Sequence, residues 1–497
     1  MKPRAVYEWL VTKGYFPEPY VLPPCFAVTK HPKYGHRFFP ADKSKRGKFS
    51  PPPAECCDVH FPKTEYTDRT FGIIDPRLHS DIACIIAKNW PAILEVLFAE
   101  DNLVCSYSFP IPPFPEGESG PMVTKSSRMI YEWIAMAEND MAAIAHKFEV
   151  LAKSDIKNFY PSVYTHSIPW ALHGKEVIRK RENRHSYAYF GNELDKLFQS
   201  ANDGCTNGIP IGPAVSDLVA EIVISGVDRL LSQKLLSPEA EGLAESAVIM
   251  RFKDDYRILA KSESAARSVL KHLQAALKEY RLELNSEKTQ FYKLPDGIFR
   301  EWVSQYHAAN RAPKKRYKFR RFKEVYLSVV RIDQLNSSCG VIDRFLADLV
   351  TEKYELRLKA SREKSLRKVV SLLLILGRLR LKAFPKILGI LEAILKRAGG
   401  RKDAEAIAQH LEEYLSDLRK KEPENRYLIA WICYFLRANG MDGRIGKNDF
   451  KDPVIRAINE DAFSFFETNP KFSIFLPITK VSSKVSLLKH LDVFGPA

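Results

Sequence analysis

The sequence predicts an α/β domain followed by an all-α domain of stacked helices. Between residues 125 and 300, helical segments alternate with short apolar runs bounded by charges, which is typical of α/β folds. After about residue 310, the chain reads as a succession of amphipathic helices. With 497 residues, of which 45% are hydrophobic, the chain is long enough for two or three domains with packed cores.

The charge of the chain favours an acidic partner. There are 76 Lys and Arg residues against 60 Asp and Glu residues, so the net charge is +16. Nucleic acid is the first partner to expect and an anionic membrane surface the second, whereas the plain alternative is a charge that only aids solubility. The longest apolar run, near "VVSLLLILG", is too short to span a bilayer, and eight scattered cysteines suit a reduced compartment. We therefore expect a soluble, cytoplasmic protein with no membrane partner.

The N-terminal part is expected to be irregular. Residues 1–65 contain the proline-rich stretches "GYFPEPYVLPPCF" and "KFSPPPAE", and we expect this segment to pack on the domain that follows. Helical periodicity begins near 78–100, in "LHSDIACIIAKNWPAILEVLFAE". A second proline-rich loop, "FPIPPFPEGESGP", then leads into the α/β region.

Residues 326–497 are predicted to form an all-α, solenoid-like domain. Pro385 near the start of one helix and Gly399–Gly400 at its end match the usual preferences at helix termini. Short polar breaks separate the helices, which favours antiparallel hairpins stacked as helical repeats of the HEAT-like kind. No fixed period marks these repeats.

Two adjacent acids interrupt a predicted β-hairpin in the α/β region. The stretch "VIMRFKDDYRIL" (248–259) has two flanks apolar enough to be strands, with Asp254 and Asp255 at the connection. A solvated Asp-Asp turn is the ordinary interpretation of such a dipeptide. Adjacent like charges become useful if a divalent cation neutralises them, and Mg²⁺ prefers carboxylate oxygens and water.

A third carboxylate precedes the hairpin by about 100 residues. "VLAKSDIKNFYPSVY" (150–164) reads as a strand that ends at Asp155 and turns into a helix. If this strand lies beside the hairpin, three carboxylates converge and can hold two metal ions. Nucleotidyl transfer requires such a site, because positioning and charge neutralisation supply most of the catalysis.

Between these segments lies a tight loop followed by a long helix. The stretch "NGIPIGPAVSDLVAEIVISGVDRLL" (207–231) contains Gly208 and Gly212, and backbone can approach a sugar or base pair closely over such glycines. A loop-to-helix junction alone indicates little. Its position between Asp155 and the paired acids makes it informative.

The sequence resembles a reverse transcriptase, with fingers and palm over residues 66–300. "SDIKNFYPSVY" resembles the first catalytic motif and "NGIPIGPAVSDLVAE" the template-primer grip. "RFKDDYRIL" resembles the double-aspartate box, and "LELNSEKTQF" resembles the lysine-containing motif that follows it. All four occur in family order.

The resemblance implies a metal site. Asp155, Asp254 and Asp255 would be the catalytic metal ligands, with help from the carbonyl of Ile156. Two Mg²⁺ ions would be bound, with Mn²⁺ as the alternative ion.

The resemblance also implies residues that bind the incoming dNTP. Tyr160 matches the bulky position that excludes a 2′-hydroxyl, unless it is a core aromatic. Gly212 would lie under the nucleotide. Lys288 matches the lysine near the pyrophosphate and is a candidate general acid, unless it is a solvated surface lysine. Arg128, and after it Lys125, would contact the triphosphate, although any basic loop would look the same.

The motifs depart from the common pattern in ways that resemble one branch of the family. Lys253 precedes the paired acids, Ile211 stands where many retroviral enzymes have glutamine, and helices replace a thumb after residue 300. These features resemble the bacterial abortive-infection polymerases of phage defence, closest to the P2-prophage type and the related K type. The resemblance implies untemplated DNA synthesis that starts on a protein hydroxyl and leaves single-stranded product attached, by a homo-oligomer. Tyr7, Tyr15, Tyr20 and the tyrosines of the helical half are candidates for the primer.

A basic linker is predicted over residues 301–325. Within it, "RAPKKRYKFRRFK" (311–323) has eight Lys or Arg among thirteen residues, interleaved with aromatics. This pattern suits single-stranded DNA, through phosphate contacts and base stacking. An equal alternative is a solvated linker whose aromatics belong to the core.

Two rival functions remain beside untemplated synthesis. The first is a templated reverse transcriptase that copies a specific RNA. The second is a catalytically silent scaffold that binds nucleic acid, against which the presence of all three acids argues.

Overall fold

The computed structural model describes residues 2–41, 49–63, 67–109, 127–240, 242–336, 339–359, 363–396 and 401–493. The chain divides into two compact units. Unit 1 consists of residues 1–17, 30–58 and 71–299, and unit 2 consists of residues 18–29, 59–70 and 300–497. Residues 1–65, expected to form one segment, are therefore shared between the units. Within the described ranges, every helix is too short or too polar to cross a bilayer.

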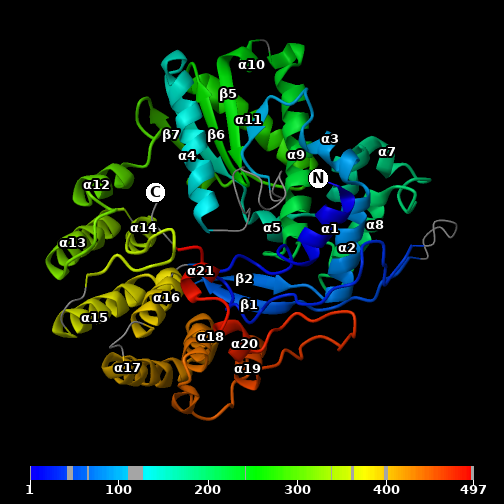
Figure 1. Ribbon diagram of the computed structural model, residues 1–497. Helices are drawn as coiled ribbons and strands as arrows, with labels where there is room; N and C mark the ends of the chain where they lie inside the picture. The colour runs from blue at the N-terminus through cyan, green and yellow to red at the C-terminus, as the bar shows by residue number, and fades with distance from the viewer. Residues whose placement is uncertain are drawn as a thin grey trace. The chain divides into compact units, whose positions relative to one another are not determined.

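Unit 1 contains a five-stranded mixed sheet in the order β3-β5-β6-β4-β7. Figure 1 labels β5, β6 and β7 of this sheet. Its strands are β3 (Val104–Ser106), β4 (Val150–Asp155), β5 (Ala247–Phe252), β6 (Asp255–Ala260) and β7 (Gln290–Lys293). β3 runs parallel to β5, and the other neighbours are antiparallel. β4 lies between β6 and β7, so it is hydrogen-bonded along both edges.

Helices cover both faces of this sheet, as the alternation of side chains along each strand requires. Ala152 and Ile258 belong to the core shared with α9 (Ala214–Leu235) and α11 (Glu263–Glu279). Leu151 and Leu259, one residue away in each strand, pack instead with α4 (Ser127–Ile144). The α/β architecture expected for this region is present.

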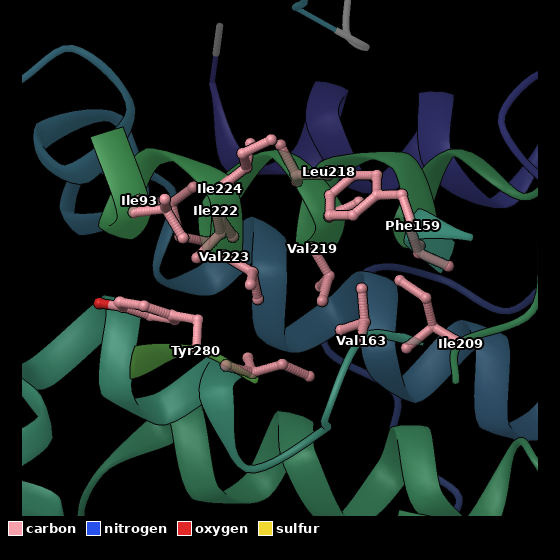
Figure 2. Packing of buried hydrophobic residues seen from close by; sticks show 14 of the residues in the cluster. Ile93, Phe159, Val163, Ile209, Leu218, Val219, Ile222, Val223, Ile224 and Tyr280 are labelled. Carbon is pink, nitrogen blue, oxygen red and sulfur yellow. The ribbon is translucent and has the colours of Figure 1, made fainter. Parts of the chain in front are cut away.

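The helix α9 is the core of unit 1. Unlike a surface helix it is apolar on nearly every side, and all but a few of its residues are buried. Figure 2 shows Val163, Ile209 and Tyr280 packed around it. Gly226 makes room for one of these contacts, because a Cβ there would lie 2.6 Å from the hydroxyl of Tyr280.

The sequence of α11 explains both its start and its packing. The side chain of Ser262 accepts a hydrogen bond from the backbone N–H of Ala265 at 3.2 Å and caps the helix. Buried residues then recur at helical spacing, which makes one apolar stripe: Ala266, Val269, Leu270, Leu273, Ala276 and Leu277.

The other elements that begin in unit 1 are mostly short helices. They are α1 (Pro3–Val11), α2 (Pro76–Lys88), α3 (Trp90–Leu97), α5 (Phe159–Ser162), α6 (Ser167–His173), α7 (Lys175–Arg179), α8 (Phe190–Ser200) and α10 (Leu243–Ser246). The strands β1 (Cys57–Pro62) and β2 (Asp68–Ile73) form a separate two-stranded sheet, and the residues of each strand are divided between the two units. α2 and α3 occupy the region expected to be helical, whereas α1 lies where irregular chain was expected.

Unit 2 is predominantly helical. From residue 300 onward it contains α12 (Glu301–Ala309), α13 (Phe319–Leu335), α14 (Val341–Asp348), α15 (Glu363–Leu379), α16 (Phe384–Leu395), α17 (Arg401–Arg419), α18 (Glu422–Ala438), α19 (Pro453–Glu460), α20 (Ile478–Ser482) and α21 (Leu487–His490). Consecutive helices pack on one another, as in α15 with α16 and α17 with α18. Pro385 lies in the first turn of α16, whereas Gly399–Gly400 lie outside the described residues. A regular HEAT-like repeat stays a prediction.

The basic run 311–323 differs from the expected strand-binding linker. Residues 301–325 contain α12 and the start of α13. Tyr317 and Phe322 are buried, so they belong to the core and are not surfaces on which bases stack. The hydroxyl of Tyr317 accepts a hydrogen bond from Asn310, and its ring lies near Phe345. The cations around these rings are mostly exposed, so only the phosphate contacts stay a prediction.

Candidate active site

The two halves of the predicted carboxylate site lie side by side. In the antiparallel ladder of β4 and β6, Asp155 stands directly opposite Asp255. β5 and β6 form the expected hairpin, and Lys253 and Asp254 are its two-residue connection. The carbonyl of Asp254 accepts a hydrogen bond from the N–H of Ile156 at 3.1 Å. This bond ties the end of β4 to the turn.

Negative charge at this edge is only partly neutralised. The ammonium of Lys288 lies 2.5 Å from Oδ2 of Asp155, and this hydrogen bond raises the pKa of the lysine. The other oxygen, Oδ1, is buried and has no hydrogen-bond partner among the described residues. Although Asp255 is exposed, loss of water around its carboxylate, followed by the charges of Asp254 and Asp155, raises its pKa to about 6.

The site has the charge that a divalent cation requires. An unpartnered oxygen on Asp155 and a raised pKa on Asp255 both mark a place where a cation would be stabilised. Within the described part of the chain, however, no group of three His, Cys, Asp or Glu side chains is close enough to hold a metal ion. The three carboxylates are thus not gathered into one set of metal ligands in this structure. The metal-ligand roles of all three, and of the Ile156 carbonyl, stay predictions.

A buried ion network lies next to the turn. Arg251, on β5, is fully buried and donates two hydrogen bonds to Glu221, at 2.7 and 3.0 Å. Its Nε donates to Asp228 at 2.8 Å, and the hydroxyl of Tyr256 donates to the other oxygen of Asp228 at 2.6 Å. Arg251 also donates to the carbonyl of Lys253 at 3.1 Å, so the network supports the turn that carries the acids.

Burial and ion pairing shift the pKa values of this network in opposite directions. Loss of water raises the pKa of Asp228 to about 6, although Arg251 and Tyr256 oppose the shift. The two carboxylates hold the pKa of Arg251 well above its usual value. The hydrogen bond from Arg251 to the carbonyl of Lys253 connects this network to the turn.

Tyr160 and Lys253 meet at one carboxylate that the motif analysis did not single out. The hydroxyl of Tyr160, on α5, donates to Oδ1 of Asp217 at 2.5 Å, and the ammonium of Lys253 lies 3.8 Å from the same oxygen. Asp217 is in the first turn of α9, where a negative charge is favourable. Tyr160 is half-buried, so its ring is neither a fully buried core aromatic nor a free surface side chain.

Lys253 occupies an unusual backbone position. Its φ is +52°, in the region that favours glycine, and its N–H donates to the hydroxyl of Ser108. The bulky cation in front of the paired acids is therefore held by its backbone at one end and by Asp217 at the other.

Gly212 is needed for packing. Its φ is +118°, and a Cβ there would lie 2.9 Å from atoms of both Pro17 and Phe71. Gly208 also has a positive φ, +85°. The structure thus gives Gly212 a packing partner on its Cβ side, and contact with a nucleotide stays a prediction.

Three basic residues were also predicted to contact the nucleotide, and the structure describes them to different extents. Lys288 is mostly exposed, and its ammonium points to Asp155. Arg128 lies in α4, but its side chain is outside the described residues. Lys125 is outside them altogether.

The spacing of the acids in α9 could have indicated from the sequence that they need buried partners. Asp217, Glu221 and Asp228 are spaced by four and seven residues, which places them on one face of a helix that is otherwise apolar. Acids in such a stripe must find partners when the helix is buried. Lys253 and Arg251 are the partners that they find.

Comparison with known proteins is in keeping with this geometry. Residues 93–319 match the family described as reverse transcriptase (RNA-dependent DNA polymerase). No curated protein matches the chain in sequence.

The similar solved structures include telomerases from two yeasts. The apo telomerase from Candida tropicalis is 11% identical with a TM-score of 0.33, over 90% of this chain and 72% of that one. Its form truncated from the C-terminal domain is 15% identical with a TM-score of 0.31, over 49% of this chain and 50% of that one. Telomerase from Candida albicans, in complex with a fragment of telomeric RNA, is 13% identical with a TM-score of 0.31, over 93% and 67%. The chain thus spans only half the length of the truncated telomerase.

Reverse transcriptases generally use two divalent metal ions, which suits the charge of the carboxylate edge. Residues 93–319 carry a reverse transcriptase domain, and the activity that this domain indicates is that of a DNA polymerase.

Proposed function

We propose that this protein is a Mg²⁺-dependent nucleotidyltransferase that polymerises dNTPs into DNA at the edge formed by β4 and β6. The observation that carries the proposal is the pairing of Asp155 with Asp255 in one ladder, beside a turn that supplies Asp254. Lys288 supplies the only positive charge in direct contact with Asp155 among the described residues. Such an edge attracts the cations that nucleotidyl transfer needs.

The chain's own groups suggest how the reaction is arranged. Two divalent ions, when bound, would activate the attacking hydroxyl and stabilise the leaving pyrophosphate. Asp155 and Asp255 would hold them, with Asp254 completing the set. Lys288 would release Asp155 and protonate the pyrophosphate. Tyr160, fixed by Asp217, would lie against the sugar and exclude a 2′-hydroxyl.

The finer proposal is untemplated, protein-primed synthesis in bacterial antiphage defence, in the cytoplasm of the host. It rests on the family resemblance and on the helices that follow residue 300 in place of a thumb. A primer tethered to the enzyme has a high effective concentration, which would compensate for weak grip on a duplex.

Burial narrows the choice of primer. Tyr7 and Tyr15, named as candidates, are fully buried, and their hydroxyls are hydrogen-bonded within the core of unit 1. Of the tyrosines beyond residue 300, all are described and only Tyr354 and Tyr414 are half-buried, whereas the others are buried. Tyr20 is half-buried as well. A primer hydroxyl is therefore best sought among Tyr20, Tyr354 and Tyr414.

Intact-mass analysis tests the proposal directly. The full chain, freed of nucleic acid by nuclease and high salt, is incubated with dNTPs and Mg²⁺. A ladder of nucleotide-sized mass additions is expected, and it should disappear in Asp155→Asn. The matched control is Asp101→Asn, which removes an exposed acid of the same unit and should leave the ladder unchanged.

The outcomes separate the alternatives. Free, unattached DNA that forms only when an RNA is added back would favour the templated enzyme. No incorporation in any arm, with dNTPs, Mg²⁺ or Mn²⁺ and added RNA or DNA, would contradict the polymerase itself and leave the scaffold.

A further inference from the structure

A second polar region of unit 1 is lined by residues that the proposed chemistry does not use. Two adjoining clefts, of about 550 and 700 Å³, are lined by the segments around α6, α7 and α8 and by the end of α11. They share Lys278 and Arg281. We call the two together the α11-end groove.

The groove is more basic than the chain as a whole. Its lining contains seven Lys or Arg residues against three Asp or Glu residues, whereas the whole chain has 76 against 60. Two of the three acids already have hydrogen-bond partners close by. Glu279 pairs with Lys175 at 2.6 Å, and Asp195 accepts a hydrogen bond from His166 at 2.5 Å. The remaining positive charge therefore faces solvent.

Several of these cations have no carboxylate partner. No ion pair with a described acid is formed by Lys157, Lys196 or Lys278, and of these Lys157 and Lys278 are exposed. Lysines and arginines at the rim of a cleft that lack internal partners are suited to phosphates. Solvated surface cations are common, so this charge alone would not identify a ligand.

The aromatic lining supplies the second observation. Tyr164, Trp170 and Tyr187 are half-buried and line the larger cleft. The guanidinium of Arg281 lies 4.0 Å from the ring centre of Tyr164, and the ammonium of Lys175 lies 5.1 Å from that of Trp170. Aromatic rings and cations together in one groove are the features by which proteins bind single strands without reading sequence.

The backbone of Arg281 adopts an unfavourable conformation. Its φ is +63°, and it follows the last turn of α11, at a position where glycine is the usual residue. The neighbouring Tyr280 is buried against Gly226, and this packing fixes the backbone just before Arg281. A side chain kept at a strained position on a cleft wall is a reason to look for a ligand.

The groove reaches the catalytic strand. Lys157 and Asn158, which line the smaller cleft, are the second and third residues after Asp155. The N–H of Lys157 donates to the carbonyl of Glu283, another lining residue, at 2.9 Å. A strand lying in the groove would thus pass close to the end of β4.

We propose that the α11-end groove binds single-stranded nucleic acid, with phosphates on Lys157, Lys278 and Arg281 and bases against Tyr164, Trp170 and Tyr187. The strand is either DNA product or an RNA, since both offer the same phosphates and ring faces. This site is separate from the carboxylates, so its occupancy requires neither metal nor dNTP.

The test measures binding of the full chain to fluorescein-labelled dT20 and rU20 by anisotropy, in EDTA and without dNTPs. The double variant Arg281→Gly/Lys278→Gln removes the two shared cations. Glycine also relieves the positive φ, so this variant is expected to fold at least as well as the parent. The charge-matched control is Lys261→Gln/Lys271→Gln, two exposed lysines that do not line the groove.

We expect the groove variant to bind at least one of the two oligonucleotides roughly tenfold more weakly at low salt, and the control to change affinity less than twofold. The slope of log affinity against log salt should fall by about 1.4 for two lost contacts with a single strand. Tyr187→Ser should weaken binding roughly tenfold with little change in that slope, because stacking does not release counterions.

Each outcome of these measurements either supports or overturns the proposal. Tighter binding of dT20 points to DNA and of rU20 to RNA. An equal loss of affinity in both double variants would mean that only net charge matters, and it would overturn the proposal. Unchanged binding in the groove variant, or preference for a dT20·dA20 duplex over both single strands, would do the same. Because no catalysis is measured, failure here leaves the polymerase proposal intact.

Discussion

Two clusters of carboxylates flank the same strand pair, and the protein treats them in opposite ways. In the buried cluster, Glu221 and Asp228 receive hydrogen bonds from Arg251, from Tyr256 and from Ser106. At the edge of the sheet, Asp155 has one lysine on one oxygen and nothing on the other among the described residues. The sheet therefore holds one saturated cluster and one unsaturated cluster a few residues apart.

This difference distinguishes acids that stabilise the fold from acids that are available to bind a metal ion. A buried acid that serves the fold brings its own cation, because an unpaired buried charge costs several kcal/mol. An acid that serves a metal must leave lone pairs unfilled, and repulsion among such acids raises their pKa. Four experiments can break or sharpen this contrast.

The largest effect is expected at the edge. Asp155→Asn keeps the shape of the side chain but removes the charge, so metal-dependent incorporation of labelled dNTPs should fall by about 10³-fold or more. Circular dichroism and Tm should stay close to those of the parent. Substantial incorporation by this variant would place the active centre elsewhere.

The buried cluster should respond in stability. Arg251→Met leaves Glu221 and Asp228 without their cation, so we expect the free energy of unfolding of unit 1 to fall by about 3–5 kcal/mol. Urea denaturation measures it. The control is Arg229→Met, which breaks an exposed pair with Asp101 and should cost less than about 1 kcal/mol.

Adding Glu221→Gln and Asp228→Asn to Arg251→Met tests the cause. The triple variant should recover part of the lost stability, because no buried charge remains. If it is no more stable than Arg251→Met, packing of the long side chain outweighs its charge.

The pH dependence of the Mg²⁺ requirement tests the role of the edge in metal binding. With the pKa of Asp255 near 6, protons compete with Mg²⁺ below that value. The Mg²⁺ concentration for half-maximal incorporation should therefore rise by about tenfold from pH 7 to pH 5. A flat profile over this range would mean that Asp255 stays ionised in the folded protein.

The smallest effect concerns the stability of the metal-free protein. The folded-state pKa of Asp255 is raised from 3.8 to about 6, so ionised Asp255 destabilises the fold above pH 6 and the penalty vanishes as pH falls through that window. Asp255→Asn in EDTA should raise Tm by roughly 1–2 °C at pH 8 and leave it unchanged near pH 4. Solvent screening keeps the effect small, because Asp255 is exposed. A lower Tm at pH 8 would show that Asp255 is stabilising.

Much of the carboxylate edge could be predicted from the sequence. Apolar runs predicted β4, β5 and β6, and the "KDD" connection placed the turn to within one residue: Lys253 and Asp254 form it, whereas Asp255 begins β6. β3 was not predicted, because three residues carry no periodicity. Arg251 was missed as well, since a single arginine in a short strand looks like a surface residue until its partners on α9 are known.

The interleaving of aromatic and basic residues in 311–323 was a less reliable predictor than the apolar runs. Tyr317 and Phe322 looked like stacking surfaces because cations surround them in the sequence, yet they lie in the core of unit 2. Phe322 lies on the buried face of the amphipathic helix α13, and Tyr317 lies before that helix, where it forms a β-bridge with Leu358. By contrast, the groove at the end of α11 combines residues from segments more than 100 positions apart, which no local pattern reveals.

The double pairing of β4 has a consequence for engineering. A slip by one residue would turn Asp155 to the opposite face, and it would have to break two ladders at once. Residues 150–155 should thus tolerate few insertions or register changes. Libraries that seek altered substrate choice should instead diversify residues 157–164, where the chain leaves the sheet.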